Sequence, residues 1–242
     1  DHLTGQTLQA QIYIRSGWVI QSAQKLHNQL SELLIAQPST EIKALENELA
    51  LPTWFDWQEP CLKSMDGMDA LAPFLLTADK HHSSDELLTI LIGDILRTVV
   101  AHEMGHVLGL RHNLAGNLSG TMSLAEHDSV LKNYLESGEF NRGHESYLSS
   151  SIMDVFSAAD DALVGAQMRE LIRDDINNSK LAHMYTHDKM AIDVGYFGKP
   201  ITKHLPFCTD EDIGTYLDCR RWDTGNKPLS FNTQRQSNLM TQ

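Results

Sequence analysis

Apolar positions in the middle of the chain recur at the spacing of an α-helix. After a capping pattern formed by Ser83 and Glu86, they fall at positions 88, 92, 95 and 99, and the same steps of four and three then reach positions 102 and 106. This spacing predicts a long helix that begins at the cap and buries one face. We therefore expect its last turns at the floor of a cleft, held there by a rigid element.

Helical spacing also recurs in shorter stretches of the chain. We expect further helices at residues 18–35, 41–51, 123–136, 157–177 and 186–194, the fourth of them broken near Gly165. Ser123 and Glu126 form a second capping pattern, and Ser137-Gly138 is expected to end the helix that they begin. From Lys199 onward the sequence is mostly irregular.

Two histidines occupy the last positions of the long helical stripe. His102 and His106 are four residues apart, so their imidazoles project from one face of the helix, a turn apart. That separation lets two ring nitrogens bind one zinc at about 2.0–2.1 Å. Glu103 lies about 100° around the helix, beside the metal. It is therefore expected to act as a general base on a zinc-bound water and not as a ligand.

A glycine and a third histidine complete the predicted metal site. Gly109 enters the left-handed conformation at little cost, so the helix can stop there and the chain can turn back. His112 then approaches the same ion. Three neutral histidines leave a fourth position open, which is typical of a catalytic site, whereas structural zinc sites are closed and usually contain cysteines. An ordinary polar helix face is the alternative interpretation of the first two histidines.

The complete pattern, H-E-x-x-H-x-x-G-x-x-H, resembles that of the metzincin clan of zinc endopeptidases. The clan also has a tight turn whose methionine lies under the zinc, and Ser151-Ile152-Met153-Asp154 resembles this Met-turn. Ordinary core filling is the other interpretation of Met153. Several metzincin families have a tyrosine two residues after that methionine, but Val155 stands here, so its role is not carried over.

One strand is predicted near the start of the chain. Residues 7–14 alternate between apolar and polar, as a half-buried strand does. In metzincins an edge strand above the zinc pairs with extended substrate, so the resemblance implies a substrate-binding role for the stretch Gln9-Ala10-Gln11-Ile12. The alternative is an edge strand without that role. Metzincin domains usually carry two or three strands and a helix before this strand, and this sequence has almost nothing before it.

The last third of the sequence adds to the resemblance. Residues 188–193 with Gly195-Tyr196, and residues 207–212, are similar to a group of large exported bacterial zinc-dependent metalloproteases of metzincin type. The similarity implies an exported protein. The sequence begins at Asp1 and not at Met, and no signal peptide is visible, so we expect a piece of a longer chain.

Charge and hydropathy exclude some partners. The formal net charge is −13, which argues against a nucleic-acid partner and against binding to anionic membranes. No apolar run approaches the roughly 20 residues that a membrane span needs. A protein or peptide substrate fits this composition, and the sequence does not indicate an oligomeric state.

Three cysteines are present, at positions 61, 208 and 219. An odd number leaves at least one outside an internal pair. Cys208 and Cys219 lie close together in a polar stretch, where they form either a local disulfide, as suits an exported protein, or two reduced thiols.

The sequence as a whole predicts an α+β, helix-rich metzincin-like catalytic domain over residues 1–242. It would contain a long zinc-binding helix, a small sheet with its edge strand above the cleft, an upper lobe over residues 1–112, and a mostly helical or irregular lower lobe over residues 113–242. The expected activity is endopeptidase cleavage with one Zn²⁺. The alternatives are a peptidase with glutamate as its third zinc ligand, a binding module that retains zinc without turnover, and a structural zinc domain.

Overall fold

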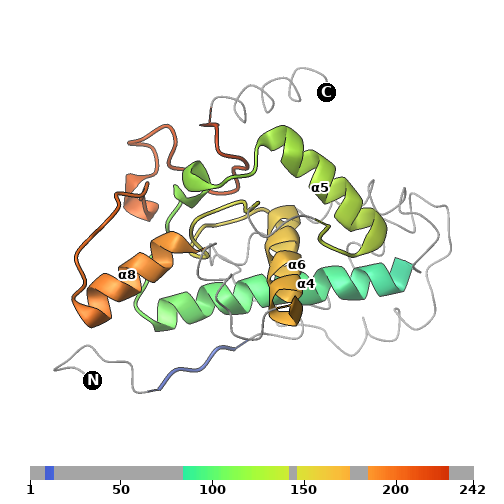
Figure 1. Cartoon of the computed structure of the whole chain (residues 1–242), viewed down its shortest axis with the longest axis horizontal. Coiled ribbons are helices and arrows are strands. Elements are labelled where there is room, and N and C mark those ends of the chain that lie inside the picture. Colours follow the sequence, from blue (N-terminus) through green and yellow to red (C-terminus); the bar gives the residue numbers. More distant parts are fainter. Residues whose placement is uncertain (1–8, 14–83, 142–145, 175–184, 229–242) are drawn as a thin grey trace, which may run out of the picture.

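A computed structural model of the chain describes residues 9–13, 84–141, 146–174 and 185–228, and this part is helix-rich (Figure 1). Its helices are α4 (Ser84–Val107), η2 (Gly116–Ser119), α5 (Leu124–Ser137), α6 (Ala158–Asp174), α8 (Thr186–Phe197) and η3 (Asp210–Asp212). The helices expected at residues 18–35 and 41–51 lie outside the described residues, as does Ser83 of the first predicted cap.

Helix α4 is the long helix that the apolar spacing predicts, and its 24 residues run along one side of the molecule (Figure 1). Its buried side chains include Leu87, Leu91 and Ile95. His102 continues this buried stripe near the C-terminal end of the helix. The stripe packs into a core shared with α5 and α6, which fixes the direction in which the last turns of α4 face.

Helix α6 crosses α4 at the middle of the long helix, and this contact corrects the break expected near Gly165 (Figure 1). The helix runs through Gly165 without interruption. A Cβ atom built there would lie 1.9 Å from the carbonyl oxygen of Asp94 in α4, so only glycine allows the two backbones to approach this closely. The glycine marks a helix crossing and not a helix end, because its role is set by a neighbour that is distant in the sequence.

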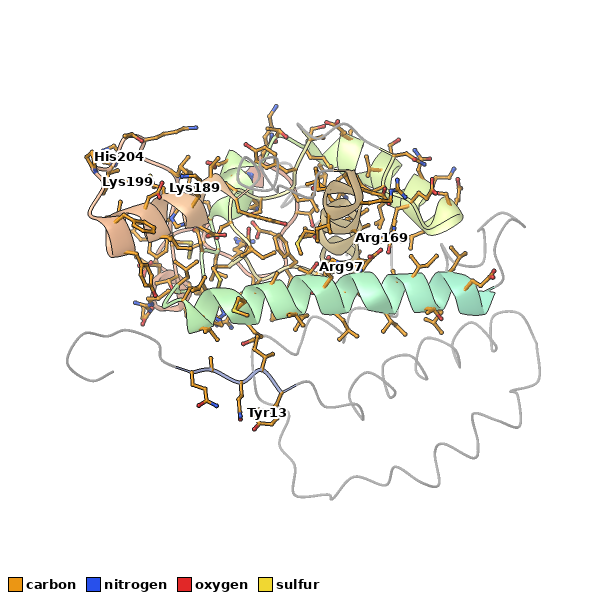
Figure 2. The ribbon with its side chains drawn as sticks, turned by 60° about the horizontal axis from the view of Figure 1, so that its bottom comes forward. Tyr13, Arg97, Arg169, Lys189, Lys199 and His204 are labelled. Atoms are coloured by element: carbon orange, nitrogen blue, oxygen red, sulfur yellow. A yellow bond between two sulfur atoms is a disulfide. The ribbon has the colours of Figure 1, made fainter. Side chains whose placement is uncertain are left out.

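A charged cluster around the buried Asp94 side chain lies at the same crossing. The carboxylate of Asp94 accepts a hydrogen bond from the Tyr134 hydroxyl (2.9 Å) and pairs with Arg97 and, at 3.4 Å, with Arg169. Figure 2 shows both arginines close to the point where α6 crosses α4. Burial raises the pKa of Asp94, while both arginines and the tyrosine oppose that shift. Asp94 thus connects α4, α5 and α6 through polar contacts.

The two shorter helices end at glycines in the left-handed conformation. In α5, the Ser123 side chain accepts a hydrogen bond from the backbone N–H of Glu126, as predicted, and Gly138 follows with φ 69°. Helix α8 continues past the expected end at residue 194 and stops before Gly198, with φ 59°. Gly195 is tolerated inside α8 because an internal glycine costs a helix only about 0.5–1 kcal/mol.

The predicted edge strand is described only in part. Residues 9–13 are not assigned to a strand, and all of them except Ile12 are exposed, so no alternating buried face is seen there. Across the described ranges, the only β pairing outside helices is an isolated bridge between Ile213 and Tyr216. The small sheet and the division into two lobes therefore stay predictions.

Among the described residues, no helix has both the length and the apolar character of a membrane span.

Candidate metal centre

The C-terminal end of α4 turns the chain sharply at Gly109, which has φ 83°. The Gly109 N–H donates to the His106 carbonyl oxygen (2.9 Å), and the Leu110 N–H donates to that of Gly105 (3.0 Å). These two bonds form a Schellman motif with glycine at its left-handed position. The turn sends the chain back beneath the last turn of α4, where His112 meets the two helical histidines.

The three predicted histidines form one cluster. Their ring centroids lie 4.9 Å apart for His102 and His106, 5.2 Å for His102 and His112, and 4.8 Å for His106 and His112. Each ring offers one nitrogen, and these nitrogens all lie within 4.8 Å of one another. In the described ranges no other three side chains of His, Cys, Asp or Glu come together in this way.

Every ring in the cluster has an oxygen acceptor at its Nδ1 atom. The acceptors are the Ile152 carbonyl for His102 (2.9 Å), the Leu110 carbonyl for His106 (3.0 Å) and the Asp210 carboxylate for His112 (2.6 Å). In a neutral imidazole that donates from Nδ1, the other nitrogen carries a lone pair. In each neutral ring the lone pair therefore lies on Nε2, which is the atom that would bind a metal.

This donor arrangement fits a zinc ion. The Nε2 atoms of His106 and His112 lie 3.2 Å apart. Two nitrogens bound to a tetrahedral zinc at about 2.0–2.1 Å would lie roughly 3.3–3.4 Å apart. Two lone pairs at this distance repel each other unless a cation or a proton lies between them. The histidines present therefore suit a zinc ion held by three imidazole nitrogens.

Burial keeps His102 in the form that a metal ligand needs. The side chain is 7 % exposed, and its removal from water lowers its pKa to about 4, with the neighbouring His106 and His112 adding to the shift. Its hydrogen bond to Ile152 opposes this change. His102 is therefore uncharged at neutral pH, which is the form in which an imidazole binds a metal.

The predicted Met-turn lies directly against the zinc-motif helix. Met153 is 1 % exposed, and a Cβ built on Gly105 would lie 2.1 Å from its sulfur. The Met153 carbonyl oxygen accepts a hydrogen bond from the backbone N–H of Asn113, the residue after His112 (2.9 Å). Ile152, one residue earlier, accepts from His102. The turn thus contacts both the helical histidine His102 and the segment that carries the third histidine.

Asp188, in the first turn of α8, holds the Met-turn in place. Its side chain is buried, and its two carboxylate oxygens accept from the Ser151 hydroxyl (2.5 Å) and the Ile152 N–H (2.6 Å). The backbone N–H of His187 donates to the Ser150 carbonyl oxygen (3.0 Å). Helix α8 therefore fixes the carbonyl of Ile152 that orients His102.

Glu103 faces a pocket beside the histidine cluster. The pocket is lined by Val99, His102, Glu103, Asp154, Val155, Phe156 and Asp161. Apolar side chains from α4 and from the residues after the Met-turn thus line this pocket together with Glu103. This position lets Glu103 act on a water or a substrate next to the cluster without joining the three nitrogens.

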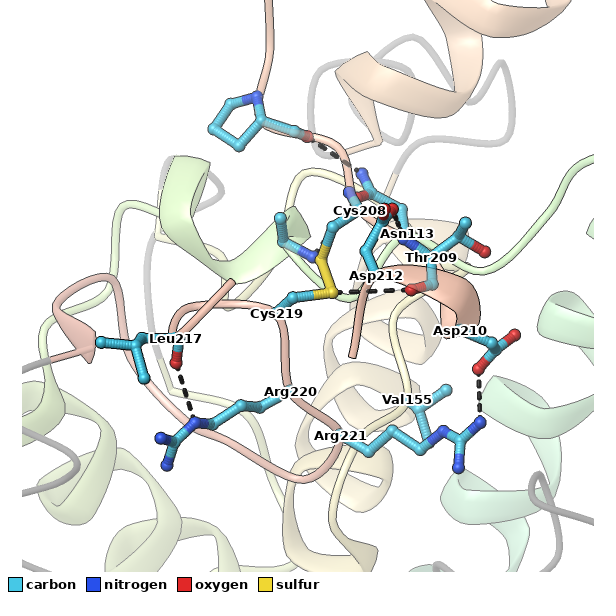
Figure 3. The surroundings of a disulfide bond; sticks show 12 residues. Asn113, Val155, Cys208, Thr209, Asp210, Asp212, Leu217, Cys219, Arg220 and Arg221 are labelled. Atoms are coloured by element: carbon cyan, nitrogen blue, oxygen red, sulfur yellow. Dashed lines mark hydrogen bonds and ion pairs between the residues drawn. A yellow bond between two sulfur atoms is a disulfide. The ribbon is translucent and has the colours of Figure 1, made fainter. Parts of the chain in front are cut away.

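A disulfide closes a loop behind His112. Cys208 and Cys219 are bonded, with Cα atoms 5.9 Å apart, so the reduced-thiol alternative does not describe this structure (Figure 3). Both cysteines are buried against Leu114, Ala115 and Val155. The loop between them carries Asp210, the carboxylate partner of His112.

The sequence did not single out three residues that support this site. Gly105 makes room for the Met153 sulfur, Asp188 holds the Met-turn, and Asp210 orients His112. The last two fall in the stretches 188–193 and 207–212, which carry the resemblance noted from the sequence. The stretch 9–12 runs alongside the C-terminal half of α4 in both views (Figures 1 and 2), and its substrate-binding role stays a prediction.

The site has the features of a zinc peptidase: a three-histidine cluster, a glutamate beside it and a methionine beneath it. In agreement, residues 84–203 match the model of a family described as Met-zincin. The match covers every residue of the cluster and the Met-turn, and it supports a metzincin-type zinc peptidase with zinc-dependent metallopeptidase activity. A search of curated proteins found no match, and neither did a search of solved structures.

Proposed function

We propose that the chain is a zinc endopeptidase in which His102, His106 and His112 hold one Zn²⁺ and Glu103 is the general base. The observation that carries the proposal is the convergence of one nitrogen from each of three histidine rings, every one of which has an oxygen acceptor at Nδ1. Glu103 lines a pocket with His102, which supports its role as the base. The Met-zincin match is consistent with this assignment.

The zinc ion, when bound, would supply Lewis-acid chemistry by polarising the scissile carbonyl and making a water easier to deprotonate. Glu103 would take the proton from the attacking water. It would then deliver that proton to the leaving amine, so one carboxylate serves as base and then as acid. The buried ring of His102 and the apolar side chains of Val99 and Phe156 limit the access of bulk water to this step.

The position two residues after the methionine carries no hydroxyl group in this chain. Val155 is buried, and its backbone carbonyl accepts a hydrogen bond from the Trp222 N–H (2.8 Å). A phenol at this position therefore plays no part in the proposed mechanism. Proton transfer is assigned to Glu103 alone.

We infer that the substrate is a protein or peptide and that the protein works in an oxidising compartment. The net charge of −13 disfavours nucleic acid. The Cys208–Cys219 disulfide supports export, because such bonds persist mainly outside the reducing cytosol.

Metal analysis combined with a peptide-library cleavage assay tests the proposal. The metal-stripped chain should take up one zinc per molecule and then cleave internal peptide bonds, and a chelator should abolish the cleavage. His112→Ala should lose zinc affinity, whereas His204→Ala, which alters an exposed histidine outside the cluster, should not.

Failure to take up zinc would contradict the proposed centre. Stoichiometric zinc without cleavage in a broad library would favour the binding module without turnover. Equal zinc affinity of His112→Ala and its parent would indicate a different third ligand, such as the glutamate of the alternative peptidase class.

A further inference from the structure

We propose that Asp210 is a positioning residue for the zinc ligand His112, and that the disulfide-closed loop from Cys208 to Cys219 holds it there, so that this loop sets the zinc affinity. The proposal rests on the zinc centre proposed above. It assigns a function to a segment that begins 96 residues after His112 and lies outside the zinc motif and the Met-turn.

His112 differs from the other two histidines in how its ring is held. His102 and His106 stand on α4, and their Nδ1 atoms donate to main-chain carbonyls. His112 lies beyond the end of α4, and its Nδ1 atom donates to the Asp210 carboxylate at 2.6 Å. The Asp210 side chain therefore orients His112, the one proposed ligand that α4 does not carry.

Asp210 is itself held at its second oxygen. Its Oδ1 atom accepts from the Arg221 guanidinium at 2.5 Å (Figure 3). Its Oδ2 atom accepts from His112. The turn around it is fixed by a capping box, in which the Thr209 N–H donates to the Asp212 carboxylate at 3.0 Å. These contacts restrict the rotation of the Asp210 carboxylate, so the conformation of the surrounding loop determines where the carboxylate lies.

The loop is attached to the chain segment that directly follows His112. The Leu114 N–H donates to the Cys208 carbonyl oxygen (2.8 Å), and the Asn113 side chain donates to the Pro206 carbonyl oxygen (3.3 Å). The disulfide joins this attached end of the loop to Cys219, two residues before Arg221. The two partners of the Asp210 carboxylate are His112 and Arg221. The chain segments that carry them are thus both held next to the Cys208–Cys219 disulfide.

A carboxylate that accepts from a ligating imidazole fixes its tautomer and its orientation and makes its second nitrogen a better donor to metal. Loss of such a partner typically weakens metal binding about 10- to 100-fold. Asp210→Asn keeps the shape of the side chain and removes its charge. We therefore expect this variant to bind zinc about 10- to 100-fold more weakly than the parent.

The matched control is Glu211→Gln. Glu211 is the neighbouring carboxylate, 69 % exposed, and it pairs with the exposed Arg111 instead of a histidine. This variant carries the same change in net charge as Asp210→Asn, and its zinc affinity should remain within about twofold of the parent. If Glu211→Gln weakens binding as much as Asp210→Asn, general electrostatics explains the effect and the positioning role is wrong.

A second variant tests whether the disulfide acts through Asp210. Cys208→Ser/Cys219→Ser should weaken zinc binding in the parent, and it should add little in the Asp210→Asn background, because both changes release the same ring. Independent effects, whose fold-changes multiply in the combined variant, would contradict the role of the loop. Far-UV circular dichroism of each zinc-free protein checks that α4 and its neighbours are still folded.

The measurement is competition for zinc against a chromogenic chelator, followed by the visible absorption of the Co²⁺-loaded proteins. Asp210→Asn at saturating cobalt should show shifted ligand-field bands, because a reoriented ligand changes the geometry at the metal. A merely structural role for Asp210 would lower stability and leave these bands unchanged.

The outcomes separate this proposal from the proposed function. If the parent binds no zinc, both fail. If the parent binds zinc and cleaves peptides while Asp210→Asn binds zinc as tightly, the positioning role fails and the peptidase assignment stands.

Discussion

The sulfur of Met153 occupies the space next to Gly105 that a larger residue in the zinc motif would fill. A Cβ atom at position 105 would lie 2.1 Å from that sulfur. The methionine is 1 % exposed and surrounded by core residues, so it has little room to withdraw. Gly105, the residue directly before the second motif histidine, is therefore matched to the Met-turn by size.

Gly105→Ala should consequently destabilise the fold even though alanine favours helices. We expect a loss of about 1–3 kcal/mol in the free energy of unfolding, which is typical of overpacking in a filled core. Gly93→Ala is the control on the same helix, because a Cβ there meets nothing within 4 Å, and it should stabilise by about 0.5–1 kcal/mol. Urea unfolding measures both. Equal effects of the two substitutions would contradict the size match.

Gly165→Ala should cost more than Gly105→Ala. The added atom would lie 1.9 Å from the main-chain oxygen of Asp94, and no side-chain rotation relieves a contact with backbone. We expect a loss of about 3 kcal/mol or more, because α4 and α6 must move apart. The same unfolding experiment gives the value, and a loss below about 1 kcal/mol would mean that the crossing is looser than described.

Met153→Leu should leave zinc binding and most of the cleavage activity intact. Leucine conserves volume and apolarity, so its cost in stability should be below about 1.5 kcal/mol. Zinc affinity, activity and urea unfolding are measured on the same preparation. Activity lost at unchanged stability and zinc affinity would show that the sulfur atom has a role beyond packing.

We expect the protein to lose stability at alkaline pH because of a buried pair, His127 and Asp160. The His127 Nε2 and Asp160 Oδ1 atoms lie 2.7 Å apart. Burial alone would lower the pKa of His127, but the Asp160 carboxylate outweighs it and raises the pKa to about 9. Burial alone would raise the pKa of Asp160, and His127 outweighs it and lowers that pKa. The pair is therefore charged at neutral pH.

His127 in the unfolded chain has a pKa near 6.5, so its stabilising effect is fully present below that pH and is lost as the pH rises through about 9. The loss should be on the order of 3 kcal/mol. Urea unfolding at pH 6, 8 and 9.5 measures it, with His127→Gln/Asp160→Asn as the variant that lacks the titrating pair. If the free energy of unfolding of the parent falls no more steeply with rising pH than that of the variant, the charged His127–Asp160 pair is not the cause.

The zinc helix, its two histidines and the turn at Gly109 could be predicted because local rules determine them. Helical spacing places His102 and His106 on one face, and a left-handed glycine ends α4 whatever the rest of the fold does. The cap at Ser123 is local in the same way. Such features need only a few neighbouring residues in the sequence.

The missed features all depend on contacts between distant parts of the chain. Asp188 bonds to Ile152 across 36 residues, and Asp210 bonds to His112 across 98. Gly165 was expected to break a helix, because the sequence does not reveal that the Asp94 backbone lies against it. A glycine or an aspartate has the same local signature in a loop, a helix crossing or a metal site, so its neighbours in the fold decide its role.

The role of Glu103 as the general base is tested by the peptide-cleavage rate of Glu103→Gln relative to its parent, measured with both proteins at full zinc occupancy. Glutamine nearly matches the shape of glutamate and leaves the three histidines untouched, so zinc affinity should not change. An amide does not accept the proton of the attacking water at neutral pH, and general acid–base catalysis is typically worth about 10²–10⁴-fold. The rate should therefore fall by at least about 100-fold at unchanged zinc content. Equal rates in the two proteins would show that Glu103 is not the base and would contradict the proposed mechanism, even if the three histidines hold the metal.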